Sequence, residues 1–158
     1  MMASYASEVK KELTSLEVHP EHAKAELAAF LRMNGVLNLH DHQFSLDITT
    51  ENPAIARRIF KLIKIAYGIE PLLIVSRKMK LKKNNQYLVR LNQKVQEILE
   101  NLQIWDPEKG LVTRIPQRIM TSREGAMSYL RGAFLAGGSV NNPCLLYTSD
   151  AADDMQCV

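Results

Sequence analysis

The stretch YLRGAFLAGGSVNNP, residues 129–143, combines small residues at helical spacing with a closing pair of glycines. An earlier stretch, ELAAFLRMNGVL at residues 26–37, has the same order of apolar, small and glycine positions. Two copies of one pattern, each ending in glycine before an extended segment, predict an internal repeat built on a helix. The aligned residues are Leu27 with Leu130, Ala29 with Gly132, Leu31 with Phe134, and Gly35 with Gly138.

Small residues recur every four positions in each copy, which places them on one side of a helix. Helix axes usually lie about 8–10 Å apart, and rows of glycine and alanine allow the close end of that range. Glycine within a helix costs about 1 kcal/mol relative to alanine, and close contact offsets that cost. Chance would explain one such helix, but two copies in register predict that the helices pack together along a pseudo-twofold axis. The expected interface residues are Ala25, Ala29 and Met33 in the first copy and Ser128, Gly132 and Ala136 in the second.

The segment between the two copies alternates hairpins with helices. Alternating periodicity on both sides of the HDH triplet at 40–42 predicts a β-hairpin with one buried face. The stretch NPAIARRIFKLIKIAYG predicts a helix that begins at an Asn52 cap and ends at Gly68. A second hairpin with a basic loop follows, and then a further helix. The sequence therefore predicts an α+β fold of the order αββαββα, followed by the second small-residue helix. The residues expected on the solvent side of the central helix are Arg57, Arg58, Lys61 and Lys64.

Capping residues predict where the two repeated helices begin and end. Gly35 suits a left-handed stop at the end of the first helix. The stretch TSRE has the spacing of a capping box, with Thr121 and Glu124 at the start of the second helix. Arg131 is expected on the outer face of that second helix.

The composition is that of one ordinary globular domain. The chain has 158 residues, of which 46% are hydrophobic, and it contains no apolar run of the ~20 residues that a membrane span needs. The N-terminus has no secretory signal pattern, which favours a cytoplasmic location without membrane association. The only cysteines are Cys144 and Cys157, so residues 1–143 have no disulfide framework and no cysteine-based zinc site. The formal net charge is +3, and it becomes +6 without the three carboxylates after residue 143, which suits a polyanionic partner.

The repeated helices resemble the paired motif helices of the LAGLIDADG homing-endonuclease fold, and the elements between them are similar to one half of that fold. The segments YASEVKKELTSLE, KAELAAFLRMNGVL and LRGAFLAGGSVNNP, all within residues 1–143, resemble the bacterial WhiA regulators, specifically their Bacillus-type form. The resemblance implies a LAGLIDADG-like N-terminal domain, followed in complete members by a second half and a C-terminal helix-turn-helix. It also implies DNA binding, mainly through that helix-turn-helix, with roles in transcription, sporulation and cell division, a nucleoid-associated location, and the transcription machinery as a further partner.

With this resemblance, the chain divides into four parts. Residues 1–20 form an N-terminal helix, residues 21–115 the first LAGLIDADG-like half, and residues 116–143 the start of the second half, with its motif helix only. Residues 144–158, CLLYTSDAADDMQCV, follow none of the earlier patterns and look like a translated sequencing-adapter read-through. A genuine acidic tail is the alternative. We therefore expect a chain truncated at its C-terminus, whose last helix lacks the sheet that would cover it.

The residues that would catalyse DNA cleavage are replaced. Nucleases of this fold carry one acidic residue at the end of each motif helix, and the two hold divalent metal. Aligned on the motif, LAAFLRMNG and LRGAFLAGG place Asn34 and Gly137 at these positions. A second position that is often acidic holds Arg32 in one copy and Leu135 in the other. The sequence therefore predicts a non-catalytic fold without metal or cofactor, and an active or nicking homing endonuclease is the alternative that these replacements oppose.

Basic residues gather on the second hairpin, in the region where the nuclease fold lies on DNA. They are suited to phosphate contacts and predict salt-dependent DNA binding. A solvated loop whose lysines protect a strand edge would explain the same pattern. A scaffold that binds protein and does not contact DNA is a further alternative. The candidate DNA-binding residues are Arg77, Lys78, Lys80, Lys82, Lys83 and Arg90.

Four histidines are weaker signals. His19 and His22 lie three residues apart, and the HDH triplet supplies two more. Because no cysteine or clear third ligand accompanies them, a helix entry and a hairpin turn are favoured over a metal site.

Overall fold

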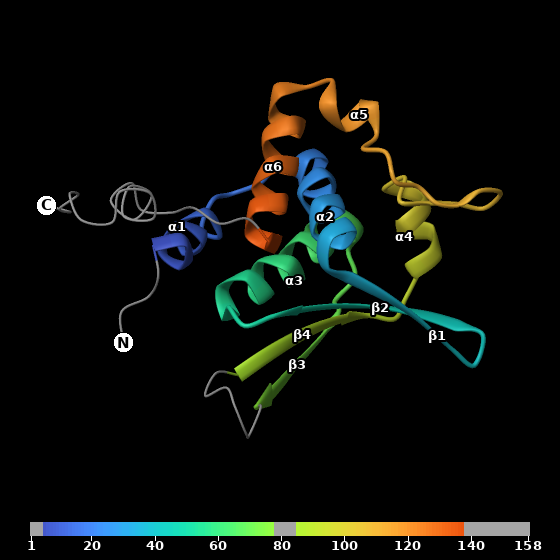
Figure 1. Ribbon diagram of the computed structural model, residues 1–158, viewed down its shortest axis with the longest axis horizontal. Helices are drawn as coiled ribbons and strands as arrows, with labels where there is room; N and C mark the ends of the chain where they lie inside the picture. Colours follow the sequence, from blue (N-terminus) through green and yellow to red (C-terminus); the bar gives the residue numbers. More distant parts are fainter. Residues whose placement is uncertain (1–4, 78–84, 138–158) are drawn as a thin grey trace, which may run out of the picture.

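The computed structural model describes residues 5–77 and 85–137 of the chain (Figure 1). The helices are α1 (Tyr5–Leu13), α2 (Pro20–Asn34), α3 (Pro53–Tyr67), α4 (Val95–Asn101), α5 (Gln117–Met120) and α6 (Arg123–Gly137). The strands are β1 (Gly35–His40), β2 (Gln43–Thr50), β3 (Leu72–Arg77), β4 (Asn85–Leu91), β5 (Trp105–Asp106) and β6 (Gly110–Leu111). The predicted α+β order is confirmed, and the short β5–β6 hairpin and α5 precede the second motif helix.

Four strands form one antiparallel sheet in the order β1-β2-β4-β3. Helices α2, α3 and α4 contact this sheet, and they lie on one side of it (Figure 1). The molecule therefore has two layers, with its core between the helices and the sheet. The largest fully buried side chains are Phe30, Leu27, Ile48, Ile59, Leu62, Ile63, Ile98, Leu135, Glu26 and Val89.

The β1–β2 hairpin turns at the HDH triplet, as predicted. Asp41 and His42 both have positive φ values, 51° and 63°, as a two-residue type I′ turn requires. The register runs from Gly35 opposite Ile48 to His40 opposite Gln43. The hairpin thus carries the chain directly from the end of α2 into the centre of the sheet.

Glycine ends α2 and α3 for different reasons. Gly68 has a φ of 67° and closes α3 in the left-handed conformation that was predicted. Gly35 has φ −72° and ψ 135°, so the prediction of a left-handed stop is wrong there. A Cβ atom at Gly35 would lie 2.5 Å from the carbonyl oxygen of Leu31. Close approach of the backbone, rather than a left-handed turn, is why glycine occupies this position.

The cap of α6 lies one residue later than predicted. The Oγ atom of Ser122 accepts a hydrogen bond from the backbone nitrogen of Gly125 at 2.9 Å. Thr121 instead donates its hydroxyl to the carbonyl oxygen of Arg118 at 2.8 Å. Serine and threonine both cap helices, so their spacing to Glu124 does not fix which of two adjacent hydroxyls takes the role.

The two motif helices, α2 and α6, lie side by side and run in the same direction (Figure 1). Pro20 and Glu21 at the start of α2 line one pocket with Ser122 and Gly125 at the start of α6, and Asn34 contacts Ala136 at the C-terminal ends. Like ends therefore meet, which is the arrangement that a pseudo-twofold axis between parallel helices produces. Helix α1 lies near the C-terminal half of α6, where the ammonium of Lys10 stands 5.6 Å from the centre of the Phe134 ring. Burial lowers the pKa of the Lys10 ammonium.

Candidate functional site

The contact between the motif helices centres on aligned small residues. A Cβ atom at Gly132 would overlap the backbone carbonyl oxygen of Glu26 and lie 3.0 Å from the Cβ of Ala29. Ala29 and Gly132 are equivalent positions of the repeat, so the closest approach lies where a twofold axis would pass. Ala25 on α2 and Ser128 on α6, each four residues before this closest contact, are also buried. Met33 is 50% exposed, and Ala136 is half-buried.

The outer sides of the two helices differ. Leu27 on α2 is fully buried under the sheet, whereas its counterpart Leu130 on α6 is 61% exposed. Met127, one turn earlier on α6, is 57% exposed. The part of the chain that the structure describes therefore covers α2 on both sides and leaves an apolar face of α6 in solvent.

At the C-terminal ends of the motif helices, polar atoms serve the packing. The side-chain nitrogen of Asn34 donates a hydrogen bond of 2.7 Å to the carbonyl oxygen of Ala136. A Cβ atom at Gly137 would meet the methyl group of Met33 at 3.1 Å. Thus the side-chain amide of Asn34 joins the two helix ends, and Gly137, the other position expected to be acidic in the motif, has no side chain.

Arg32 and Leu135 stand at the second motif position that is often acidic, and both side chains have structural roles. Arg32 donates from Nη2 to the carbonyl oxygens of Gln103 at 3.0 Å and Arg114 at 2.7 Å, which fastens α2 to the segment after α4. Leu135 is buried in the core. Within residues 5–77 and 85–137, no group of three or more histidine, cysteine, aspartate or glutamate side chains is placed to hold a metal ion.

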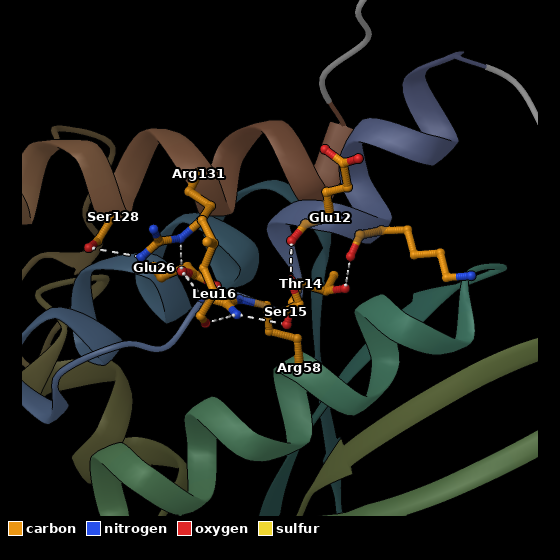
Figure 2. Close-up of polar contacts among 9 residues, drawn as sticks. Glu12, Thr14, Ser15, Leu16, Glu26, Arg58, Ser128 and Arg131 are labelled. Carbon is orange, nitrogen blue, oxygen red and sulfur yellow. Dashed lines mark hydrogen bonds and ion pairs between the residues drawn. The ribbon is translucent and has the colours of Figure 1, made fainter.

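A buried carboxylate joins three helices (Figure 2). Glu26 on α2 is fully buried and accepts hydrogen bonds from Arg58 on α3 and Arg131 on α6. Arg131 also donates to the hydroxyl of Ser128 at 3.3 Å. The predictions that Arg58 and Arg131 face solvent are therefore wrong. The side chain of Arg58 is only 2% exposed because it supplies the charge that the buried carboxylate needs.

Arg58 also binds the segment between α1 and α2. Its Nη1 atom donates to the carbonyl oxygens of Thr14 at 3.0 Å and Leu16 at 2.7 Å (Figure 2). One guanidinium therefore satisfies a carboxylate of the core and two backbone acceptors of the N-terminal segment. Sequence spacing contained a signal for this, since Arg58 follows Ile55 by three residues and precedes Leu62 by four, on the buried stripe of α3.

The face of the sheet away from the helices, the open face, carries one ion pair in its centre. Asp47 and Arg90 are cross-strand neighbours on β2 and β4. Arg90 donates from Nε and Nη2 to the two oxygens of Asp47 at 2.9 and 3.0 Å, and Asn38 donates to the same carboxylate at 3.1 Å. The hydrogen bonds and charge of Asp47 raise the pKa of the Arg90 guanidinium. Of the candidate DNA-binding residues, Arg90 is thus already paired with an acid.

Apolar side chains surround this ion pair on the open face. Leu72 lies opposite Arg90, Ile74 lies opposite Leu88, and Val36 lies opposite Asp47. Because cross-strand neighbours share a face, all of these side chains belong to the open face. Leu72, Ile74 and Val36 are exposed. The described part of the open face is consequently more apolar than the basic DNA-binding surface that the sequence predicted.

The remaining basic candidates divide between the end of β3 and its loop. Arg77 is exposed at the last position of β3, opposite Asn85. Register places it on the helix side of the sheet, two residues beyond Val75. Lys78, Lys80, Lys82 and Lys83 lie outside the described residues.

The histidines take the structural roles that were favoured for them. His19 caps α2, with its Nδ1 atom accepting from the backbone nitrogen of Glu21 at 3.4 Å. Its ring centre is 5.8 Å from that of His22. His40 and His42 belong to the first hairpin.

Two parallel small-residue helices in close contact, the first of which packs on an antiparallel sheet, define a LAGLIDADG-like domain. The sequence matches the family model of the WhiA N-terminal LAGLIDADG-like domain over residues 20–105 and that of the WhiA LAGLIDADG-like domain over residues 126–148. The chain belongs to the WhiA N-terminal LAGLIDADG-like domain family, which confirms the resemblance seen in the sequence.

Relatives and solved structures agree with this placement. The "Probable cell division protein WhiA" of Lactobacillus acidophilus is 96% identical over 142 residues, which are 90% of this chain and 46% of the relative. The protein of that name in Lactobacillus helveticus is 94% identical over the same lengths. This chain spans about half the length of these curated relatives.

Two crystal structures share the fold. The N-terminal LAGLIDADG domain of DUF199/WhiA matches with a TM-score of 0.61 and 20% identity over 90% of this chain and 63% of that one. Full-length DUF199/WhiA from Thermatoga maritima matches with a TM-score of 0.59 and 22% identity, over 89% of this chain and 42% of that one.

Among the described residues, no helix has the length and apolar character to cross a bilayer.

Proposed function

We propose that this chain is the LAGLIDADG-like part of a DNA-binding transcription regulator and that it does not cleave DNA. Relatives that carry the name of a cell division protein support a role in that process. Sporulation is a second proposed role. The proposed partners are DNA, bound mainly through a helix-turn-helix outside this chain, and a protein of the transcription machinery. The proposed location is cytoplasmic and nucleoid-associated.

The observation that carries the loss of cleavage is the hydrogen bond from Asn34 to Ala136. Metal-assisted cleavage of a phosphodiester needs oxygen ligands that fix the metal against the phosphate. The amide nitrogen of Asn34 is instead used to join the helix ends, and Gly137 offers no ligand. A metal between these ends would find at most the neutral side-chain oxygen of Asn34 from these two positions, and no carboxylate.

A nicking assay tests this proposal. Supercoiled plasmid is incubated with the 158-residue chain and with the Lactobacillus acidophilus relative, in Mg²⁺ or Mn²⁺, with an active LAGLIDADG nuclease as the positive control. We expect no relaxed or linear product above the metal-only background. Metal-dependent nicking that disappears in Asn34→Ala would contradict the proposal and establish the endonuclease alternative.

The basic hairpin is the proposed DNA contact within this chain. Each phosphate contact that is lost reduces the slope of log K against log salt by about 0.9. Replacing Lys80, Lys82 and Lys83 together by alanine should therefore reduce the slope by about 2 to 3. The control is Arg57→Ala with Lys61→Ala, which removes two positive charges from the exposed side of α3 and should leave the slope almost unchanged. A slope that the triple variant does not alter would remove this contact from the proposal.

Protein binding by the open face is the second candidate function. It is favoured by the Asp47–Arg90 pair, which leaves the centre of this face nearly neutral, and by the exposed Leu72 and Ile74 beside it. Fluorescence anisotropy with labelled duplex DNA at low salt separates the candidates. Saturable binding that weakens as salt rises supports DNA contact, and no binding at low salt favours the protein scaffold.

We further propose the division into residues 1–20, 21–115, 116–143 and 144–158, with the last segment a non-native read-through. The segment after residue 137 lies outside the described residues, so sequence composition is the support. Resequencing the locus tests it. A reading frame that continues past Pro143 without CLLYTSDAADDMQCV is expected, and the same tail in a fresh amplicon would contradict the proposal.

A further inference from the structure

Strand β3 lies at the edge of the sheet and is exposed on both faces. Among the described residues it pairs only with β4 (Figure 1). Its four apolar residues are all exposed: Leu72 by 50%, Leu73 by 42%, Ile74 by 39% and Val75 by 54%. Leu72 and Ile74 lie on the open face, and Leu73 and Val75 lie on the helix side. Within the described residues, the strand therefore offers a free backbone edge together with apolar side chains on both faces of the sheet.

Edge strands of monomeric proteins are usually protected against pairing with another chain. Protection takes the form of charged residues on the strand, bulges, very short strands or cover by a helix or loop. Between Leu72 and Val75, β3 has no charged or polar residue, and its ladder with β4 runs without a bulge from Leu72 to Arg77. Such an edge favours the addition of a further strand, with main-chain hydrogen bonds giving affinity.

We propose that β3 pairs in an antiparallel manner with β3 of a second copy of this chain, forming one continuous sheet across a twofold axis perpendicular to it. This proposal concerns assembly and does not depend on the proposed function. The pairing would cover apolar residues on both faces of both strands, and it would satisfy the free backbone groups of two edges at once.

The charges at the two ends of β3 favour this partner and this direction. Glu70 precedes the strand, and Arg77 ends it. In an antiparallel pair, the acidic end of one strand lies beside the basic end of the other, whereas a parallel pair would bring like ends together. Glu70 is exposed and pairs with Lys64 at 3.1 Å within the same chain, so its carboxylate already lies at the surface near the edge.

The association state of the 158-residue chain tests the proposal. Sedimentation equilibrium over a concentration series should show a mass that rises from 17.9 kDa toward twice that value. Ile74→Lys places like charges near each other across the proposed pair and should raise the dimer dissociation constant at least about tenfold. Ile74 is exposed at an edge, so circular dichroism should show an unchanged fold. A wild-type chain that stays monomeric at every concentration would overturn the proposal.

Leu130→Lys is the matched control, because α6 presents a further exposed apolar face among the described residues. It should leave the dissociation constant unchanged. If Leu130→Lys abolishes the dimer and Ile74→Lys does not, the copies associate through α6 and the proposal is wrong. Hydrogen exchange gives a second readout, since the amides of residues 72–76 should become protected as the chain concentration rises.

Charge exchange tests the antiparallel direction. Glu70→Lys should weaken the dimer, and adding Arg77→Glu should restore it, because the opposite charges then meet again at each end. Lys64→Met removes the same intramolecular ion pair without changing the charge of Glu70, and it should not weaken the dimer. Equal weakening by Lys64→Met and Glu70→Lys, or no restoration in the double variant, would contradict the pairing.

Discussion

Helices α2 and α6 carry the same sequence pattern, yet they lie in different surroundings. On the sides that face each other they match, with Ala29 against Gly132 at the point of closest approach. On their outer sides they differ, since Leu27 is buried and Leu130 is exposed. The repeat therefore encodes the contact between the helices, whereas burial of an outer side depends on whether a sheet packs there. One leucine in the same pattern can contribute to stability in one copy and almost nothing in the other.

The largest expected effect comes from Glu26, the buried carboxylate that joins α2 to α3 and α6. Glu26→Ala leaves the buried guanidinium of Arg58 without its counter-charge, and breaking such a pair costs about 3–5 kcal/mol. Urea denaturation followed by circular dichroism measures the loss. Arg131→Met is the matched variant, because the Arg131 side chain is 18% exposed and its removal leaves Glu26 paired with Arg58, so a smaller loss is expected. Equal losses would mean that α6 depends on this cluster as strongly as α3 does.

The comparison of the outer sides has a direct test in two equivalent leucines. Leu27→Ala should destabilise the chain by about 2–5 kcal/mol, because it opens a cavity in the core. Leu130→Ala removes a side chain that is mostly in solvent and should change the free energy of unfolding by about 0.5 kcal/mol or less. Both are measured as midpoints of urea unfolding at one chain concentration. A large effect of Leu130→Ala would indicate that another copy or segment covers α6 in solution.

Two glycines of α6 sharpen the comparison of the inner sides. Gly132→Ala forces a methyl group against the Glu26 carbonyl and should cost about 1–3 kcal/mol, as overpacking does. Gly137→Ala meets only the flexible end of Met33, and it should be neutral or slightly stabilising because alanine favours helix. The difference in thermal midpoint between the variants measures how closely the helices are held. Identical midpoints would disprove the close contact at Gly132.

The smallest expected effect concerns the ends of the motif helices. Asn34→Ala removes the hydrogen bond to Ala136 and should cost about 0.5–1.5 kcal/mol. Asn38→Ala removes an exposed hydrogen bond from a side-chain amide to Asp47 on the open face. It serves as the control, and a smaller loss of stability is expected. Urea unfolding of both variants gives the comparison. If Asn34→Ala is as mild as Asn38→Ala, the amide does not hold the helix ends together.

Much of the fold could be predicted because local signals and burial agree. Asn52 and Gly68 mark the ends of α3 by chemistry that acts within a few residues, and the HDH turn follows the same logic. Alternation along β2 reports its buried face, since Leu46 and Ile48 are buried and Asp47 is not. These features need no knowledge of distant residues.

The polar site was harder to predict because its partners are distant in sequence. Glu26 and Arg131 are separated by 105 positions, and neither shows in its local pattern that the other is near. The pairing of Arg90 with Asp47 likewise depends on strand register, which basic residues alone do not reveal. The capping hydroxyl of α6 differed by one residue because Thr121 and Ser122 are chemically similar. Charge was visible in the sequence, but the identity of each counter-charge was not.

The hydrogen bonds from Arg58 to the carbonyl oxygens of Thr14 and Leu16 have a practical consequence for where the folding unit starts. The family match begins at residue 20, after both of these carbonyls. A chain that begins at residue 20 would keep the guanidinium of Arg58 buried but would lack the carbonyl oxygens of Thr14 and Leu16. Buried N–H donors of Arg58 would then have no hydrogen-bond partner, which is destabilising. The segment that contains Thr14 and Leu16 therefore belongs to the same cooperative unit as the motif helices, and a minimal version of the domain should retain it.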